Sequence, residues 1–308
     1  IRGRNLHDNY LLVKQVARKI HARKNRGVFL KLDISCAFDS LSWPFLFEVL
    51  CAKGFGGRCL RWIAVLLQTS STRVLVNGVP RRRIWHAKGL RQGDPVSPLL
   101  FVIAMEALTA LVSKAMTDGV LSSYTGISAT QRLSIYADDV ALFANPTNQD
   151  LLFVRIALQL FGEASGLGVN YRKSSAILIS EDQEDKARVQ NLLQCPIGEF
   201  PCKYLGLQLA IKHLTKAHWQ PLLDQVRHCL PAWQRGLLQR SSRLVLVKSV
   251  LQARPVHQLL VMKALGLVLE DIDGWMCVFL WAGKDRVNGG QCLVAWSSIC
   301  KPTCFGGI

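Results

Sequence analysis

Acidic residues are scarce in this 308-residue chain, where 21 Asp and Glu stand against 38 Lys and Arg for a formal net charge of +17. An excess of positive charge this large indicates a polyanionic partner, with nucleic acid favoured over a membrane surface. Charged residues make up only 19% of the chain, and half of it is hydrophobic. This composition excludes an intrinsically disordered or fibrous protein, and the length allows two domains of roughly 150 residues.

Long apolar runs and secretory signals are also missing. The longest apolar stretches are interrupted by Glu106 and Lys263, so none reaches the roughly 18 residues of a membrane span. We therefore expect no membrane-spanning helix and no membrane partner. The opening segment is basic, which is not typical of a secretory signal, and we expect an intracellular protein.

Paired cysteine motifs are absent, although the chain has ten cysteines. No two of them form a Cys-x-x-Cys pair, and the seven histidines do not cluster near them. A core of this size does not need disulfides, so we favour reduced thiols. Only Cys292, Cys300 and Cys304 lie close enough in sequence to suggest a metal site.

Hydrophobic periodicity and turn residues predict helices and strands that intermix without strict alternation, which is typical of the α+β class. A strand is expected over 27–34, and hairpins over 73–83 and 133–144. Helices are expected over 8–26, 42–53, 58–68, 97–116 and 150–165, with Asp8, Ser42 and Ser97 among the N-caps. From 208 to 268 the chain has nine Lys or Arg and a single acid, which suggests a domain boundary after Leu205.

The most informative acids lie in apolar surroundings. Asp138 and Asp139 are adjacent at the tip of an apolar hairpin, and Asp33 is the lone acid of an apolar strand. Strands disfavour Asp, and adjacent carboxylates beside a core are costly without a counter-charge. Taken alone, the pair could be an ordinary surface turn. If the two strands are neighbours, the three carboxylates meet at one edge and form a hard-oxygen site suited to two Mg²⁺ ions.

A basic protein with such a site suggests a nucleic-acid polymerase or nuclease. Three ordered segments resemble the central motifs of reverse transcriptases: Leu-Asp-Ile-Ser-Cys-Ala-Phe-Asp at 32–39, Gly-Leu-Arg-Gln-Gly-Asp-Pro at 89–95, and Tyr-Ala-Asp-Asp at 136–139. The best fit is to the non-LTR (LINE-type) retrotransposons of plants, and segments 165–174, 203–207 and 280–283 agree with it. One departure is Cys36, where the family commonly carries Lys.

The resemblance implies a right-hand polymerase with fingers, palm and thumb, in which the palm is an antiparallel sheet packed on helices and the thumb is helical. Fingers and palm would occupy 1–205, with the palm mainly at 27–41 and 85–205. The thumb and a truncated C-terminal connector would occupy 206–308.

The resemblance also implies roles for single residues. Asp33, Asp138 and Asp139 would be the catalytic triad and would hold two Mg²⁺ ions, with Mn²⁺ as a possible substitute. Lys173 would assist the departing pyrophosphate, although a lysine after an asparagine is often only solvated. The residues implied to contact the incoming nucleotide are Phe38, Gln92, Gly93 and Tyr136, and the residues of the implied primer grip are Tyr204, Leu205 and Gly206.

Some of these roles have plainer alternatives. Phe38 matches the steric gate that excludes ribonucleotides, but it could be a core aromatic near a helix start. Gln92 supplies a donor and an acceptor, and Gly93 removes a side chain where the backbone must approach a base pair. The Tyr204–Gly206 segment could be a generic β-turn.

The leading hypothesis is an RNA-directed DNA polymerase of a LINE-type retrotransposon. Its partners would be an RNA template, a DNA primer or RNA–DNA duplex, and deoxynucleoside triphosphates, in the cytoplasm and nucleus. A second hypothesis is a catalytically silent retroelement remnant that only binds nucleic acid. A third is an RNA-templated RNA polymerase, against which Phe38 argues.

Overall fold

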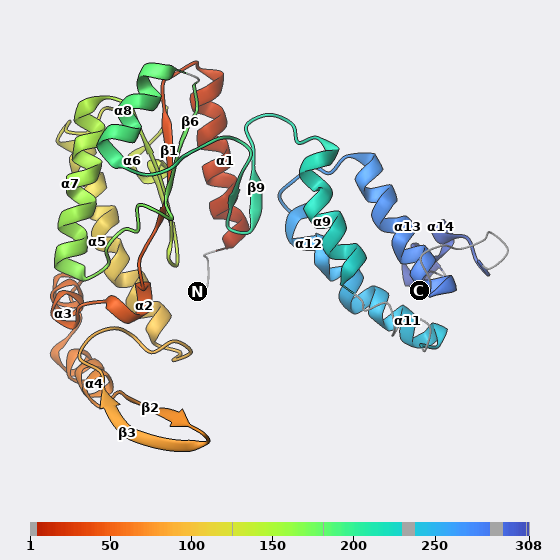
Figure 1. Ribbon diagram of the computed structural model, residues 1–308, viewed down its shortest axis with the longest axis horizontal. Helices are drawn as coiled ribbons and strands as arrows, with labels where there is room; N and C mark the ends of the chain where they lie inside the picture. Colours follow the sequence, from red (N-terminus) through yellow and green to blue (C-terminus); the bar gives the residue numbers. More distant parts are fainter. Residues whose placement is uncertain are drawn as a thin grey trace. The chain divides into compact units, whose positions relative to one another are not determined.

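The computed structural model describes residues 5–124, 126–180, 182–229, 238–283, 292–305 and 307 (Figure 1). The chain divides into two compact units, Ile1–Ile211 and Lys212–Ile308. This division lies near the compositional change that the sequence shows after Leu205. Each unit is described by itself below.

The first unit mixes helices and strands. Its helices are α1 (Leu6–Ala22), α2 (Ala37–Ser40), α3 (Trp43–Ala52), α4 (Gly57–Gln68), α5 (Ser97–Thr117), α6 (Ala129–Arg132), α7 (Asn148–Ser165) and α8 (Gln183–Leu193). Its strands are β1 (Val28–Asp33), β2 (Ser71–Val76), β3 (Val79–Trp85), β4 (Leu133–Tyr136), β5 (Asp139–Ala144), β6 (Ser175–Leu178), β7 (Ile197–Gly198), β8 (Cys202–Tyr204) and β9 (Leu207–Leu209). The predicted α+β class is confirmed.

A five-stranded sheet forms the centre of this unit, in the order β4-β5-β1-β6-β7. The pairs β4–β5, β5–β1 and β1–β6 are antiparallel, and only β6–β7 is parallel. The strands β2–β3 and β8–β9 form two separate hairpins. The sheet is therefore mainly antiparallel, as the resemblance implies for a palm.

The two faces of the sheet are covered differently because side chains alternate along each strand. Leu30 and Leu32 face the main hydrophobic core, which they share with buried residues of α3, α5 and α7. Phe29 faces the other way and contacts the rings of Phe143 and Tyr204. In Figure 1, α1 and the β8–β9 hairpin lie on one side of the sheet, and α5, α7 and α8 lie on the other.

The helix α5 tests the expectation that no helix could span a membrane. By length and composition it is long and apolar enough to do so, because its apolar run tolerates Glu106 and Lys114. Buried core helices pass the same test. Eight residues of α5 are buried, and the helix contacts α3 and α7 within the core.

Several element boundaries agree with the sequence, whereas two predicted caps are wrong. The side chain of Asn5, rather than Asp8, accepts the hydrogen bond at the start of α1, from the backbone N–H of His7. Ser97 is the first residue of α5 and Val96 occupies the N-cap. Ser42 is the N-cap of α3, although its side chain makes no capping hydrogen bond.

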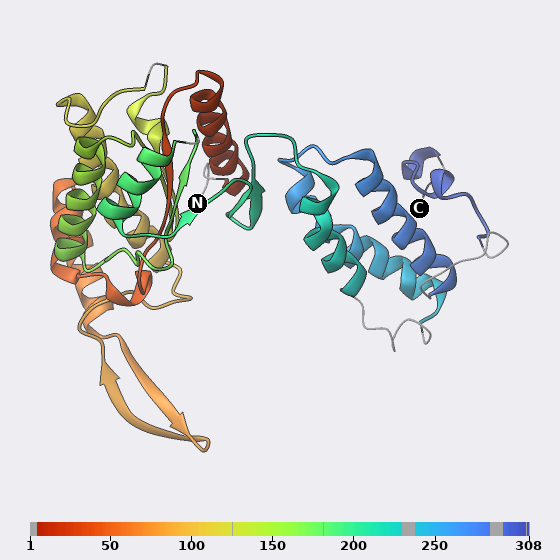
Figure 2. The same ribbon diagram turned by 45° about the horizontal axis from the view of Figure 1, so that its top comes forward.

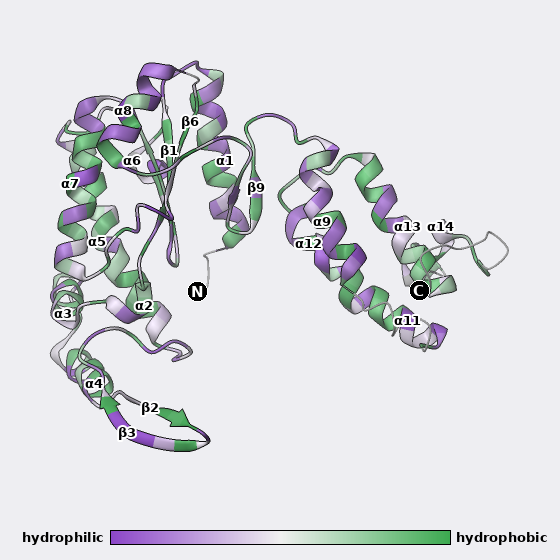
Figure 3. Ribbon diagram, viewed as in Figure 1, coloured by the Kyte–Doolittle hydropathy of each residue, from purple (hydrophilic) through white to green (hydrophobic). Residues whose placement is uncertain are grey.

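The β2–β3 hairpin follows the predicted Asn77-Gly78 turn, in which both residues have positive φ. Figure 2 shows it extending from α4 away from the central sheet. Nearly all of its residues are exposed. Figure 3 shows hydrophobic colour over most of the central sheet, whereas β3 is mainly hydrophilic.

The described part of the second unit is helical, as the sequence predicts for a thumb. Its elements are α9 (Lys216–His228), α11 (Arg240–Leu246), the π-helical η1 (Val247–Leu251), α12 (Ala253–Leu259), α13 (Gly266–Ala282), α14 (Trp296–Ile299) and the 3₁₀ turn η3 (Thr303–Phe305). The helix α13 packs against α9 and α11, and Lys216 of α9 forms an ion pair with Asp271 of α13 at 2.8 Å.

Candidate active site

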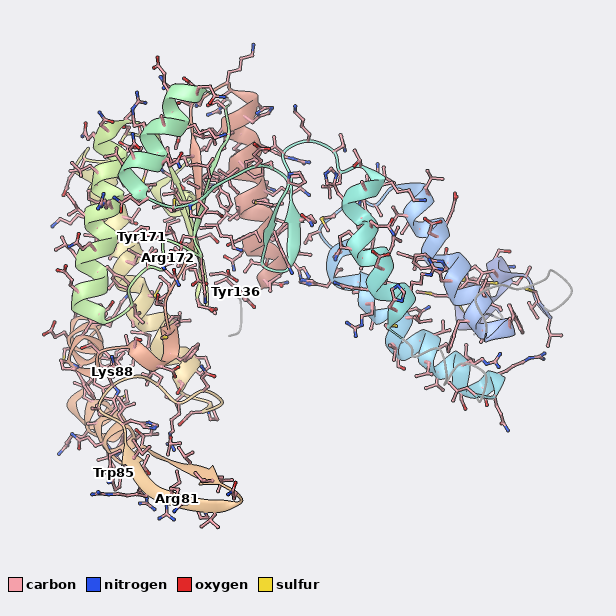
Figure 4. The ribbon with its side chains drawn as sticks, viewed as in Figure 1. Arg81, Trp85, Lys88, Tyr136, Tyr171 and Arg172 are labelled. Carbon is pink, nitrogen blue, oxygen red and sulfur yellow. The ribbon has the colours of Figure 1, made fainter. Side chains whose placement is uncertain are left out.

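Three neighbouring strands bring Tyr136, Asp139 and Asp33 into one row. In the register of the sheet, Tyr136 of β4 lies opposite Asp139 of β5, and Asp139 lies opposite Asp33 of β1. Directly opposite residues of antiparallel strands point to the same face. The sequence left open whether the strands that carry Asp33 and Asp139 are neighbours, and the structure shows that these two strands are paired. Tyr136 is labelled at the end of the sheet in Figure 4.

Asp138 precedes this row in the β4–β5 turn and is exposed. The turn consists of Ala137 and Asp138, and Ala137 has a left-handed backbone with φ of 54°. On the neighbouring segment, Cys36 also has a left-handed backbone, with φ of 46°. Such backbones cost about 1–2 kcal/mol in a residue other than glycine and are frequent at functional sites. Both chain segments that carry the acids thus bend sharply beside them.

The electrostatics at this end of the sheet reflect three carboxylates, two in the row and Asp138 in the turn, without a direct counter-charge. Burial raises the pKa of the half-buried Asp139 carboxyl, and the nearby charges of Asp138 and Asp33 raise it further, while Lys31 lowers it. Within the described part of the chain, no ion pair includes any of the three acids. The concentration of negative charge favours a bound cation.

The donor set fits a hard divalent cation, but the ligands are not assembled. Carboxylate oxygens are the ligands that Mg²⁺ prefers. In the residues that the structure describes, however, no three His, Cys, Asp or Glu side chains form a group that could hold a metal ion. The acids are neighbours in the sheet, and their side chains would have to turn toward one another to share an ion.

The loop that carries Lys173 is bonded to the backbone of Asp33. The Asp33 N–H donates to Ser174 Oγ at 3.0 Å, and its carbonyl accepts from the Asn170 N–H at 2.8 Å. The side chain of Lys173 is exposed. Figure 4 labels Tyr171 and Arg172 on the same loop. The fold places this loop beside Asp33, and the role of the lysine stays a prediction.

Phe38 lies on α2, just after β1. Its ring stacks on that of Phe101 in α5, with centroids 4.8 Å apart. The stacking makes Phe38 part of the edge of the core, which agrees with the alternative that it is a core aromatic near a helix start. It also holds the ring in place on the segment that follows Asp33. Its role as a steric gate stays a prediction.

The glycine-rich loop before α5 is attached to the segment of Phe38. The Gly89 N–H donates to the Leu41 carbonyl at 2.8 Å, and Trp43 Nε1 donates to the Gly89 carbonyl at 2.8 Å. A Cβ at Gly89 would lie 2.5 Å from the Asp39 carbonyl oxygen, whereas one at Gly93 would meet no atom within 4 Å. A close approach of two backbone segments therefore occurs at Gly89, whereas Gly93 (φ +87°) serves a left-handed turn with open space beside it. The approach of Gly93 to a base pair stays a prediction.

A cleft of about 520 Å³ opens beside this loop. Its lining residues are Asp39, Thr72, His86, Lys88, Gly89, Leu90, Arg91 and Gln92. The predicted residue Gln92 therefore lines a cavity together with two cations. Lys88 and Arg91 were not among the predicted site residues, although their proximity in sequence to the Gln-Gly pair could have indicated them.

The predicted primer grip is the turn of the β8–β9 hairpin. Leu205 and Gly206 both have positive φ, of 50° and 78°. Tyr204 is fully buried edge-on against Phe29, Leu205 is buried as well, and only Gly206 is exposed. Burial raises the pKa of the Tyr204 hydroxyl to about 12, while a hydrogen bond with the Ser134 side chain lowers it. A contact with primer at this turn can therefore involve the backbone near Gly206, but not the two larger side chains.

Comparison with known families identifies the class of this protein. Residues 1–209 match the model of the family described as reverse transcriptase (RNA-dependent DNA polymerase). The chain therefore belongs to this family, in agreement with the resemblance that its motifs show.

Within the family, the chain is homologous to the reverse transcriptases of non-LTR retrotransposons. It is 26% identical over 302 residues to the transposon TX1 uncharacterized 149 kDa protein of Xenopus laevis. That alignment covers 94% of this chain and 22% of the Xenopus protein. It is 27% identical over 261 residues to the Pol polyprotein of the type-2 retrotransposable element R2DM of Drosophila melanogaster, with 82% of this chain and 24% of that protein covered. The chain thus spans about a quarter of these relatives.

A telomerase from Candida albicans, solved in complex with a TWJ fragment of telomeric RNA, aligns with a TM-score of 0.47 and 13% identity. The alignment covers 92% of this chain and 48% of that chain.

Proposed function

We propose that this chain is an RNA-directed DNA polymerase of a non-LTR retrotransposon, which extends a DNA 3′-hydroxyl on an RNA template with deoxynucleoside triphosphates. The observation that supports this most is the row of Tyr136, Asp139 and Asp33 at the end of a family-typical sheet, with Asp138 in the adjoining turn. In this proposal, 1–205 act as fingers and palm, and 206–308 as thumb and connector.

Asp33, Asp138 and Asp139 would hold the divalent ions, two Mg²⁺ or Mn²⁺. Such ions, when bound, stabilise the attacking and leaving oxygens of a phosphoryl transfer. The row itself supplies the oxygen ligands and concentrates negative charge where cations are needed. The exposed Lys173, on the loop bonded to Asp33, would approach the departing pyrophosphate with its positive charge.

The cleft beside Gln92 would receive the templating base and the incoming nucleotide. Lys88 and Arg91 line it and suit the phosphates, and Gln92 offers both a donor and an acceptor to a base. Phe38, held against Phe101, would occupy the place where a 2′-hydroxyl would lie, and Tyr136 would contact the nucleotide from the row of acids.

The test is primer extension on an RNA template with Mg²⁺ and deoxynucleotides. The parent chain should give product, and Asp138→Asn should lower the rate at least about 100-fold, since a loss of about 2.7 kcal/mol of transition-state stabilisation has this effect. Asp118→Asn, at the exposed end of α5, is the matched control and should retain the parent rate. A folded parent that binds duplex but gives no product would overturn the proposal.

A second candidate function is the catalytically silent remnant that only binds nucleic acid. The observation in its favour is that the three carboxylates do not form a three-ligand group in the described structure. A silent remnant should bind an RNA–DNA duplex equally well with Mg²⁺ and with EDTA, and should never extend the primer.

The choice of sugar is tested by Phe38→Val. Incorporation of ribonucleotides relative to deoxynucleotides should rise in this variant if the ring excludes the 2′-hydroxyl. Phe101→Leu, which removes the stacking partner but keeps Phe38, is the control for effects of packing alone. An unchanged sugar preference in Phe38→Val would leave Phe38 as a core residue only.

A further inference from the structure

The β2–β3 hairpin is almost entirely solvent-exposed. All seven residues of β3 and five of the six residues of β2 are exposed, including several large hydrophobic side chains. Figures 1 and 2 both show the hairpin standing away from the central sheet of its unit. Its side chains therefore contribute little to the core, and their composition calls for another explanation.

The hairpin and the adjoining helix α4 lie in the longest stretch of the first unit that has no acidic residue. Between residues 49 and 93 there are nine Lys or Arg and no Asp or Glu. These cations are Lys53, Arg58, Arg61, Arg73, Arg81, Arg82, Arg83, Lys88 and Arg91. A surface of this charge is complementary to a polyanion.

The register of the hairpin sorts these side chains onto two faces. Arg73 lies opposite Arg83, and Ser71 lies opposite Trp85. Because alternate residues of a strand share a face, Arg73, Arg83 and Trp85 lie on one side, which we call the arginine face. Thr72 lies opposite Ile84, and these two residues point to the other side. The register shifts between Arg73 and Leu75, so this alternation does not extend to Arg81 and Arg82.

Two exposed indoles accompany the arginines. Trp85 is 57% exposed and lies beneath the guanidinium of Arg83, which is 5.3 Å from the ring centroid. On α4, Trp62 is 63% exposed and lies beneath Arg58 at 4.8 Å. Exposed aromatic rings beside cations can stack on unpaired bases. A duplex keeps its bases stacked on one another, so the rings favour a single strand.

The hairpin is continuous with the cleft beside Gln92. The hydroxyl of Thr72 on β2 is 2.7 Å from Nε2 of His86, at the end of β3, and both residues line the cleft. Lys88 lines it further along the same chain segment. Figure 4 labels Arg81, Trp85 and Lys88 in sequence from the hairpin toward the body of the unit.

We propose that the arginine face, together with Trp62 of α4, binds single-stranded RNA. The arginines would contact successive phosphates, and the indoles would stack on unpaired bases. On the proposed polymerase function, this RNA is the template on its way to the cleft. The occupant is single-stranded RNA rather than a protein, because the surface combines exposed indoles with arginines that form no ion pair within the described part of the chain.

The experiment measures fluorescence anisotropy of a labelled, unstructured single-stranded RNA with the whole chain. Arg83→Ala should weaken binding several-fold and reduce the slope of log affinity against log salt by about 0.7, the value for one phosphate of a single strand. Lys114→Ala, which removes an exposed cation in the last turn of α5, outside the arginine face, is the matched control and should have a clearly smaller effect.

The stacking component is tested by Trp85→Ala, which should weaken binding about fivefold or more. Ile84→Ala removes a similarly exposed side chain from the opposite face and should leave affinity near that of the parent. Since all four side chains are exposed, thermal melting should be unchanged in every variant.

Three results would overturn the proposal. One is unchanged RNA affinity in Arg83→Ala and Trp85→Ala, and another is an equal loss in the two controls. The third is concentration-dependent self-association of the parent that Trp85→Ala or Ile84→Ala abolishes while RNA affinity persists, which would assign the surface to a second copy of the chain. If the chain does not extend a primer but its RNA binding still depends on the arginine face, only the proposed polymerase function is overturned.

Discussion

Asp139 is the residue whose ionisation most directly opposes folding at the candidate site. Burial raises the pKa of its carboxyl, and Asp138 and Asp33 raise it further. An acid whose folded-state pKa lies above the unfolded value binds its proton more tightly in the folded chain. Its ionisation therefore destabilises the fold once the pH exceeds the unfolded pKa.

We expect Asp139→Asn to raise the melting temperature at pH 7, because the substitution removes a charge that is partly desolvated and close to two like charges. The gain should shrink as the pH falls and vanish where Asp139 is protonated in both states. Calorimetry between pH 3 and pH 8 measures this, with Asp118→Asn as the control. A gain that does not depend on pH, or a loss at pH 7, would contradict the assignment.

Two buried tyrosines donate hydrogen bonds to backbone carbonyls. The hydroxyl of Tyr10 donates to the Gln208 carbonyl at 2.7 Å, and that of Tyr124 donates to the Ala144 carbonyl at 2.7 Å. Tyr10→Phe and Tyr124→Phe should each lower the free energy of unfolding by about 1 kcal/mol, because each removes a hydrogen-bond donor from a buried site. Denaturant unfolding measures the two losses. Unchanged stability in both variants would show that these hydrogen bonds do not stabilise the fold.

At the scale of elements, the join between α7 and the segment after β1 depends on one glycine. Gly166 caps α7 with φ of 77°, and a Cβ there would lie within overlap distance of the Ser40 carbonyl oxygen. Gly54, after α3, has φ of 82° and open space around it.

Gly54→Ala should therefore cost only the left-handed backbone, about 1–2 kcal/mol. Gly166→Ala should cost more than about 2 kcal/mol, because it adds a clash with the backbone of Ser40, whose N–H is hydrogen-bonded to the Cys36 carbonyl. Denaturant midpoints measured with constant m-values decide the comparison. If the two variants lose the same stability, Gly166 does not hold the two segments at their close approach.

The elements with strong local signals could be predicted from the sequence. The Asn77-Gly78 turn dictates its hairpin, and the apolar run before Asp33 dictates β1. The caps of α1 and α5 were predicted wrongly because neighbouring polar residues compete for the same role. Asn5 and Asp8 both suit an N-cap, and the surrounding fold decides between them.

The candidate active site could be predicted from the sequence only on the condition that the strands carrying Asp33 and Asp139 are neighbours in one sheet. Pairing of β1 with β5 joins residues more than a hundred positions apart, and no local pattern determines it. The burial of Tyr204 and the close approach at Gly89 also follow from long-range packing against Phe29 and Asp39. The arginine face, by contrast, is visible in the sequence as a stretch without acids, but its two-sided arrangement required the strand register.

At the scale of the whole molecule, the net charge of +17 should dominate affinity for nucleic acid. Binding of an RNA–DNA duplex should weaken linearly in a plot of log affinity against log salt. Neutralising six phosphates predicts a slope of about −5. Titrations between 50 and 300 mM KCl measure it, and an affinity independent of salt would exclude phosphate contacts as the main contribution.

The central claim is that Asp33 and Asp138, far apart in sequence, share divalent ions at one end of the sheet. Electron paramagnetic resonance of Mn²⁺ in the presence of the whole chain measures this without any need for activity. We expect the parent to bind Mn²⁺, and Asp33→Asn and Asp138→Asn each to weaken this binding at least tenfold, with Asp118→Asn unchanged. Mn²⁺ binding at the parent affinity in both Asp33→Asn and Asp138→Asn would contradict a shared metal site. So would parent affinity in the variant that combines the two substitutions.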